Sequence, residues 1–122
     1  DYERFREEVL VPLKKNCAFI YRPFSCKTFT LSEPVTVIPR ILNIVEGTYS
    51  LHPYFEAPYD LRIFLSVDSK IQLERISQRP PHLVQRFITD WIPMEKRYFD
   101  FFRIPLQADL LLDTSGDKSV NA

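Results

Sequence analysis

The sequence predicts a layered α/β fold with a mostly parallel sheet. Short apolar runs rich in β-branched residues alternate along the chain with stretches whose apolar residues recur at helical spacing. This alternation is typical of α/β proteins. The length of 122 residues and the hydrophobic content of 45% fit one compact domain. We therefore expect a domain over residues 1–114 and a polar tail over residues 115–122.

The first part of this domain is predicted to be a helix followed by short strands. Apolar side chains from Tyr2 onward predict an amphipathic helix to about Val11, which Pro12 ends or kinks. Three short β-branched and aromatic runs follow, namely Phe19 to Tyr21, Thr28 to Leu31 and Val35 to Ile38. Ser32-Glu33-Pro34 is a turn signal between the last two runs, so we expect a small antiparallel β-hairpin excursion beside the main sheet. Tyr21 is a candidate to line a substrate site, although packing is the commoner role of such an aromatic.

A candidate site lies at the end of the run from Ile41 to Val45. The run is apolar at nearly every residue, which predicts a buried central strand, and Glu46 and Gly47 follow it directly. Because ligands of open α/β sheets bind beyond the carboxyl ends of the strands, Glu46 is a candidate metal ligand. The same carboxylate could instead cap a helix or pair with an arginine. His52, in the following loop, is a candidate either for ligand contact or for a structural bond to the backbone.

A second strand and helix carry two candidate arginines. Leu61 to Val67 predicts another central strand, and Asp68 and Ser69 after it supply the N-cap of a helix. Ser69 and Gln72 form a capping box, and the helix is predicted to run to Arg79. Arg75 and Arg79 are four residues apart, so we expect both guanidinium groups on one helix face. There they can clamp phosphoryl oxygens through planar bidentate hydrogen bonds. The alternative is that both are merely exposed or contact the helix C-terminus.

The remaining elements are predicted to be mainly structural. Helices are expected from about His82 to Trp91 and again after Pro93, with broad apolar stripes that belong in a core. Arg86 adds to the charge of the segment from 75 to 86, which contains no acid. The run from Ala108 to Asp113 predicts the last strand.

Composition narrows the classes of partner. The 16 Lys and Arg residues balance the 16 Asp and Glu residues, so bulk electrostatics predict no nucleic-acid partner. No apolar span is long enough to cross a membrane, and Cys17 and Cys26 lack the spacing of a metal site, so we expect a cytoplasmic protein with reduced thiols. Because its only glycines are Gly47 and Gly116, the chain contains no G-x-x-x-x-G-K-[ST] phosphate-binding loop.

Five segments of the chain follow one another in an order that is specific as a set. They are Tyr-Arg-Pro-Phe at 21–24, Ile-Val-Glu-Gly-Thr-Tyr-Ser-Leu-His-Pro at 44–53, Tyr-Asp-Leu-Arg-Ile-Phe-Leu at 59–65, Gln-Leu-Glu-Arg-Ile at 72–76 and Trp-Ile-Pro-Met-Glu at 91–95. Together they resemble the uridine kinase branch of the phosphoribulokinase/uridine kinase family. The similarity runs from Asp1 to about Asp113 and corresponds to the C-terminal portion of such a kinase.

The resemblance implies part of a three-layer α/β/α P-loop kinase with a helical lid, which moves the γ-phosphoryl group of ATP to the 5′-hydroxyl of a nucleoside. Glu46 would help to hold Mg²⁺, and Arg75 and Arg79 match lid arginines that close over the phosphates. Tyr21 matches an aromatic that lines the nucleoside site, and His52 lies where substrate contact is expected.

The chain also departs from the family pattern. The phosphate-binding loop and the catalytic Asp would precede Asp1, so we expect a piece of a longer protein and no turnover by the 122 residues alone. Ser25 stands where bacterial relatives commonly have Asp, and Pro80 and Pro81 stand where a longer lid loop is expected. Unpaired strand edges would favour a homo-oligomer. The alternatives are a non-catalytic binding or assembly module that uses the helices over residues 83–102, or a kinase of another small hydroxyl substrate.

Overall fold

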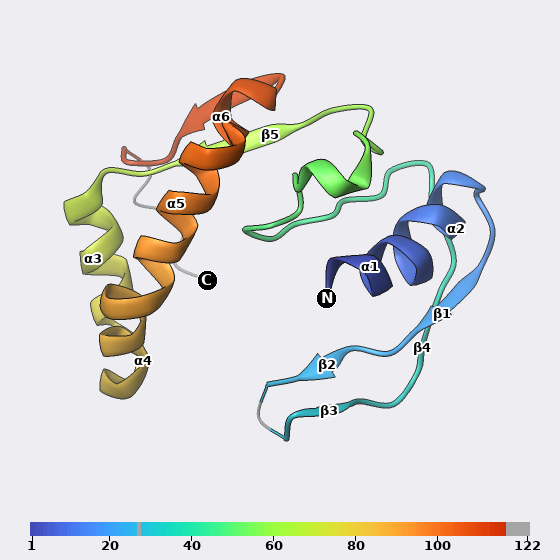
Figure 1. Cartoon of the computed structure of the whole chain (residues 1–122), viewed down its shortest axis with the longest axis horizontal. Helices are drawn as coiled ribbons and strands as arrows, with labels where there is room; N and C mark the ends of the chain where they lie inside the picture. The colour runs from blue at the N-terminus through green and yellow to red at the C-terminus, as the bar shows by residue number, and fades with distance from the viewer. Residues whose placement is uncertain (27, 117–122) are drawn as a thin grey trace. The chain divides into compact units, whose positions relative to one another are not determined.

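The structure is a computed structural model that describes residues 1–26 and 28–116. The chain forms two compact units, of which the first is Asp1–Pro58 and the second begins at Tyr59 (Figure 1). The predicted polar tail lies outside the described residues from residue 117 onward. Within the described residues, no helix is long and apolar enough to cross a membrane.

The first unit opens with one continuous helical run. It comprises α1 (Tyr2–Phe5), the π-helical turn η1 (Arg6–Leu10) and α2 (Val11–Lys14). The Asp1 carboxylate caps its start by accepting a hydrogen bond from the Arg4 N–H. The sequence predicts an end near Val11, whereas the helix continues through Pro12 to Lys14. The Val11 N–H bonds the Arg6 carbonyl five residues back, and this widened turn makes room for the proline ring.

Two short antiparallel strand pairs follow this helix. β1 (Phe19–Tyr21) pairs with β4 (Val35–Val37), and β2 (Phe24–Ser25) pairs with β3 (Thr30–Leu31). The three expected strands are therefore present as β1, β3 and β4 and are antiparallel, although each is only two or three residues long. The hairpin expected between the last two does not form, because β3 pairs with β2 and β4 pairs with β1.

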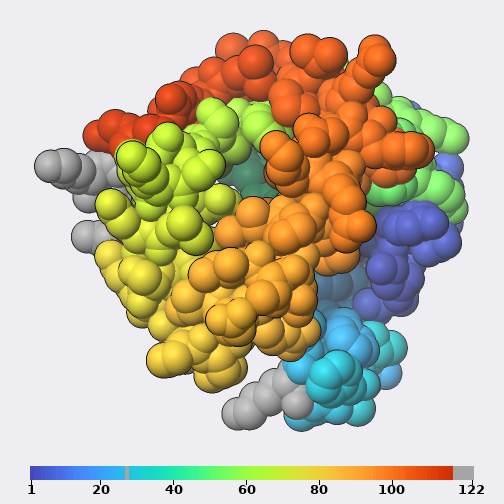
Figure 2. Space-filling view, turned by 60° about the vertical axis from the view of Figure 1, so that its left-hand side comes forward, coloured from blue at the N-terminus to red at the C-terminus, as the bar shows by residue number. Residues whose placement is uncertain are grey.

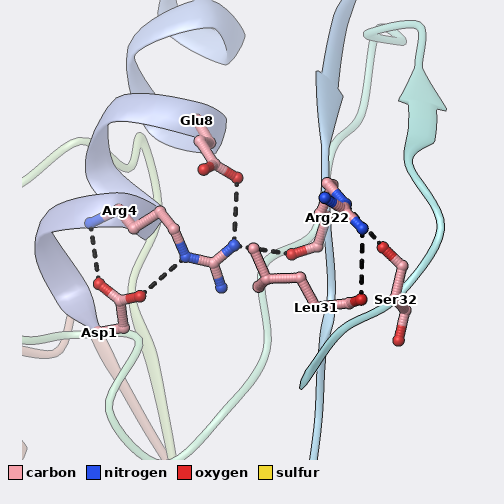
Figure 3. A network of polar contacts seen from close by, with 6 residues as sticks. All are labelled: Asp1, Arg4, Glu8, Arg22, Leu31 and Ser32. Atoms are coloured by element: carbon pink, nitrogen blue, oxygen red, sulfur yellow. Dashed lines mark hydrogen bonds and ion pairs between the residues drawn. The ribbon is translucent and has the colours of Figure 1, made fainter. Parts of the chain in front are cut away.

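Arginine side chains hold these strands together and attach them to the helix (Figure 3). Arg22 donates from Nε to the Ser32 carbonyl at 2.8 Å and from Nη2 to the Leu31 carbonyl at 3.3 Å. Arg4 donates from Nη1 to the Arg22 carbonyl at 2.8 Å and forms an ion pair with Asp1 at 2.8 Å. The Arg22 bonds join the strand segments to one another, and the Arg4 bond attaches them to α1.

The core of the first unit is small and partly aromatic. Leu10 on η1 and Phe55 on the 3₁₀-helix η2 (Pro53–Phe55) are its buried side chains. Phe5 of α1 packs on Phe55 with 5.5 Å between ring centroids. The loop that follows Gly47 is thus packed back against the N-terminal helix.

The predicted central strand from Ile41 to Val45 does not form. The backbone bends at Ile41 and Leu42, and no strand is paired with this segment in the part of the chain that the structure describes. The Asn43 side chain closes a local turn, because its Oδ1 accepts from the Arg40 N–H at 2.9 Å and its Nδ2 donates to the Arg40 carbonyl at 2.7 Å. Ile44 is 80% exposed. The apolar composition favoured burial, but a strand also needs a neighbour with which to pair.

The second unit contains one parallel strand pair with helices between its strands. Its elements are β5 (Ile63–Ser66), α3 (Ser69–Ser77), α4 (Pro81–Arg86), the π-helical turn η3 (Phe87–Trp91), α5 (Ile92–Phe102), α6 (Ile104–Gln107) and β6 (Leu110–Asp113). β5 and β6 are parallel, with Ile63 opposite Leu110. Ile76 of α3 and Ile104 of α6 are buried. The strands predicted near residues 61–67 and 108–113 are confirmed.

Two local predictions for these helices were wrong. The N-cap expected at Asp68 and Ser69 is Asp68, whose carboxylate accepts from the Lys70 N–H at 2.8 Å, so the capping box of Ser69 and Gln72 does not form. The sequence also predicts a break at Pro93, whereas α4, η3 and α5 follow one another as a single helical run through that proline. As at Pro12, a π-helical turn precedes the proline and accommodates its ring.

The predicted fold class is therefore corrected. The described residues form three sheets of two strands each, of which two are antiparallel, and they contain no extended parallel sheet. A three-layer α/β/α arrangement with a mostly parallel sheet needs several strands in one ladder. The alternation of strands and helices predicted local elements correctly in several places, but which strands share a sheet depends on contacts between distant segments.

Candidate functional site

Glu46 lies in an irregular, exposed segment just before a turn. Gly47 follows with a φ of 149°, a backbone conformation that favours glycine. Apart from Gly47 and its two chain neighbours, no described residue has an atom within 4 Å of the position where a Cβ would stand. The turn continues with a bond from the Ser50 N–H to the Gly47 carbonyl at 3.0 Å. Glu46 is therefore not at the end of a strand as predicted, although its carboxylate is accessible from solvent.

His52 has a structural role at one of its ring nitrogens. Nδ1 accepts a hydrogen bond from the Tyr54 N–H at 3.1 Å and so caps η2. The imidazole stacks on Tyr2 of α1, with 4.8 Å between ring centroids and an interplanar angle of 10°. The structural alternative that the sequence left open for His52 is thus present, because this ring joins the loop after Glu46 to the N-terminal helix.

Tyr21 is the last residue of β1 and lies opposite Val35 of β4. It is partly buried, as expected for an aromatic that packs within a small strand pair. A more exposed aromatic pair lies nearby in sequence, where Phe24 and Phe29 meet edge to face with 6.5 Å between centroids. Phe29 has a φ of 56°, a left-handed conformation that costs energy for a bulky side chain.

Arg75 is committed to the ends of both parallel strands. Its Nη2 donates to the Thr114 carbonyl at 2.7 Å, and its Nη1 donates to Thr114 Oγ1 at 3.3 Å. Thr114 Oγ1 in turn donates to the Ser66 carbonyl at 3.0 Å. Arg75 therefore connects α3 to Thr114, just after β6, and through Thr114 to Ser66, the last residue of β5. This is a structural task for at least part of its guanidinium group.

Arg79 has a different environment from Arg75. α3 ends at Ser77, so Arg79 lies in the bend that follows and its amide donates to the Ile76 carbonyl at 2.9 Å. The guanidinium carbon is 5.2 Å from the centroid of the Phe87 ring. The expectation that both arginines project from one helix face was wrong, because the helix ends before Arg79.

Sequence reasoning gave little weight to polar residues at the carboxyl ends of β5 and β6. The rule that selected Glu46 also applies to Asp113, the last residue of β6. Its Oδ1 accepts from the Ser115 N–H at 2.8 Å, and hydrogen bonds from Ser115 lower the pKa of Asp113. Ser115 Oγ accepts from the Asp68 N–H at 2.7 Å. These groups bond to one another and so fix the two strand ends.

The residues present can hold Mg²⁺ only if a bound substrate supplies further oxygen ligands. The described residues contain no group of three or more His, Cys, Asp and Glu side chains that could hold a metal ion. Mg²⁺ in phosphoryl transfer enzymes is commonly bound by one or two carboxylates together with waters and substrate phosphates. The single accessible carboxylate of Glu46 fits that kind of coordination and does not fit an all-protein site.

Arg86 is a cation that sequence reasoning noted only as part of a basic segment. Its guanidinium carbon is 5.0 Å from the centroid of the Trp91 ring, five residues further along the helix. The usual search for helical neighbours considers spacings of three and four, so it overlooks this pair. A proline two residues after Trp91 was the available signal, because it favours a widened turn at this point.

Comparison with protein-family models gives no match for the chain. Comparison with curated proteins gives no significant match either.

Proposed function

We propose that the protein to which these residues belong is a cytoplasmic kinase that transfers a phosphoryl group from ATP to the 5′-hydroxyl of a nucleoside. The observation that carries this proposal is the ordered set of five segments that resemble uridine kinases. Nucleoside and nucleoside triphosphate are the partners, and Mg²⁺ is the cofactor. The proposal rests on residue chemistry and does not require an extended parallel sheet within these residues.

Glu46 is the residue we assign to Mg²⁺. Its carboxylate is exposed and precedes the Gly47 turn, so a metal ion that is also held by phosphate oxygens can approach it. The ion would neutralise charge on the transferring phosphoryl group. In reactions of this type the protein contributes mainly positioning and charge stabilisation, so one carboxylate and one or two arginines are a substantial part of the machinery.

Arg79 is the stronger of the two assigned lid arginines. Its side chain is exposed, whereas Arg75 already donates to Thr114 from both terminal nitrogens. A guanidinium group placed against an aromatic ring keeps its N–H donors directed outward and loses little freedom when it binds a phosphate. Tyr21 and His52 remain the proposed nucleoside contacts.

The decisive experiment uses the protein expressed from the complete reading frame that contains this sequence. With ATP and Mg²⁺, uridine or cytidine is expected to yield one nucleoside 5′-monophosphate per ADP. Glu46→Gln is expected to lower kcat about a hundredfold with little change in nucleoside affinity, since it removes charge stabilisation specific to the transition state. Glu33→Gln is the matched control, because Glu33 is an exposed carboxylate in the same unit, and its kcat should stay within about twofold.

Two results would defeat these assignments. Absence of turnover with every nucleoside, together with turnover of a sugar phosphate or another small alcohol, would replace the substrate class. Wild-type kcat in Glu46→Gln would refute the role of that carboxylate.

A second candidate function is a non-catalytic assembly module. The observation in its favour is apolar exposure near the C-terminal end of α5, where Phe101 is 80% exposed, and on the following helix α6, where Leu106 is 78% exposed. Exposed apolar patches are typical of interaction surfaces, and these two side chains lie on consecutive helices. No turnover of any alcohol, combined with a stable complex that Phe101→Ser abolishes, would favour this function over the kinase.

A further inference from the structure

We propose that Arg79 and Arg86 form a two-point binding site for an oligophosphate, held in place by the rings of Phe87 and Trp91. The inference deepens the proposed function. It rests on that function only in identifying the anion as the phosphate chain of a nucleoside triphosphate. It assigns a role to Arg86 that the resemblance did not, and it leaves Arg75 with a structural role.

The two guanidinium groups lie against two aromatic rings that contact each other. Arg79 lies 5.2 Å from the Phe87 centroid and Arg86 lies 5.0 Å from the Trp91 centroid. The two rings meet edge to face, with 4.6 Å between centroids and an interplanar angle of 88°. Each ring face attracts a cation, so the pair restricts both long side chains, which nevertheless remain exposed.

The charge on these arginines is not neutralised within the described residues. Neither Arg79 nor Arg86 has a carboxylate within 4.0 Å in that part of the chain. The sequence contains no acid between Glu74 and Asp90, and both arginine side chains are exposed. The segment around α4 forms part of the molecular surface, where it is drawn in yellow in Figure 2. An anion can therefore reach both guanidinium groups.

The π-helical turn explains why Asp90 does not neutralise Arg86. In a regular α-helix, residues four apart lie on the same face, so Arg86 and Asp90 would be neighbours. In η3 the Ile92 N–H bonds the Phe87 carbonyl five residues back, which places Trp91 instead of Asp90 beside Arg86. Asp90 Oδ1 accepts from Thr89 Oγ1 at 2.8 Å. In the widened turn, Arg86 therefore contacts an aromatic ring instead of forming an ion pair with Asp90. Such π-helical turns are often found at functional sites.

The geometry favours an anion with two or more phosphate groups. Each guanidinium group presents a planar set of donors that matches two phosphate oxygens. The two groups rest on different rings, so one phosphate occupying both would have to bridge the ring pair. A chain of linked phosphates instead offers a separate phosphate group to each arginine.

The test measures binding of inorganic tripolyphosphate to the 122-residue chain by titration calorimetry at low ionic strength. Arg79→Gln and Arg86→Gln are each expected to weaken binding about tenfold. Arg97→Gln, an exposed arginine on α5, is the matched control for loss of one positive charge and should weaken binding less than about twofold. Arg86→Lys keeps the charge but loses the planar donors, so a loss of about threefold is expected.

ATP is titrated beside tripolyphosphate to separate the phosphate chain from the nucleoside. Arg86→Gln is expected to weaken both by the same factor, because the site contacts only phosphates. Wild-type binding by Arg86→Gln, an equal loss in Arg97→Gln, or a loss confined to ATP would overturn the inference. If nucleoside phosphorylation is absent while tripolyphosphate still needs both arginines, the anion site stands and the proposed kinase function fails. If the nucleoside is phosphorylated and Arg86→Gln binds tripolyphosphate as tightly as wild type does, the kinase function stands and the proposed anion site fails.

Discussion

Ile104→Ala provides the sharpest test of how the second unit is built. Ile104 is 1% exposed and begins α6, directly after Arg103 in a left-handed conformation with a φ of 50°. The substitution removes carbon atoms worth about 2 to 3 kcal/mol in transfer free energy. The cavity that remains brings the expected loss of unfolding free energy to about 3 to 4 kcal/mol. A loss of this size is a large fraction of the stability of a small domain.

Leu106→Ala is the matched control for this substitution. Leu106 lies on the same helix but is 78% exposed, so its truncation should change the unfolding free energy by less than about 0.5 kcal/mol. Urea unfolding can be followed by the fluorescence of Trp91, which is the only tryptophan and lies in the second unit. Equal destabilisation by the two variants, or a loss below about 0.5 kcal/mol for Ile104→Ala, would refute the assignment of Ile104 to the core.

Two further predictions concern polar contacts of the second unit. Hydrogen bonds from Arg62 lower the pKa of Asp109 from 3.8 to about 2, so the stability that this contact adds is complete above about pH 4 and is lost as the pH falls towards 2. The difference in unfolding free energy between wild type and Asp109→Asn should therefore disappear as the pH falls over that range. A difference that stays constant with pH would contradict the contact. Arg75→Gln should lower the unfolding free energy by about 1 to 2 kcal/mol because it removes the bonds to Thr114, whereas Arg79→Gln should cost less than about 0.5 kcal/mol. Urea titration of both variants checks this order, and the reverse order would contradict the division of roles.

The strands show how far local sequence patterns determine this fold. The runs at Ile63–Ser66 and at Ile41 to Val45 are both short and apolar, but only the first forms a strand. β5 has a parallel neighbour in β6, and the Arg62 contact to Asp109 fixes the start of that ladder with bonds of 2.8 Å and 3.1 Å. The second run has no paired neighbour among the described residues, and the Asn43 turn bends it locally. Composition therefore identified segments able to pair but not the partners they pair with.

The candidate site shows the same limit at the level of side chains. Spacing in the sequence placed Arg75 and Arg79 together, because residues four apart are neighbours in a helix. It could not show that Thr114, far along the chain, accepts hydrogen bonds from Arg75. Nor could it show that His52 caps η2 through Nδ1. Residue type and spacing limit the available chemistry, whereas contacts with distant residues decide which side chains are left to perform it.

The two prolines connect the errors in helix prediction to the proposed anion site. Each π-helical turn ends two residues before a proline, at Leu10 before Pro12 and at Trp91 before Pro93. A proline cannot donate to the carbonyl four residues back, and its ring crowds that carbonyl, so a wider turn removes the conflict while the helix continues. The same widening changes which side chains are neighbours. At η3 it places Arg86 on Trp91 and away from Asp90. Sequence rules treat Pro93 as a helix breaker, but here the turn that accommodates it leaves the charge of Arg86 available to a ligand.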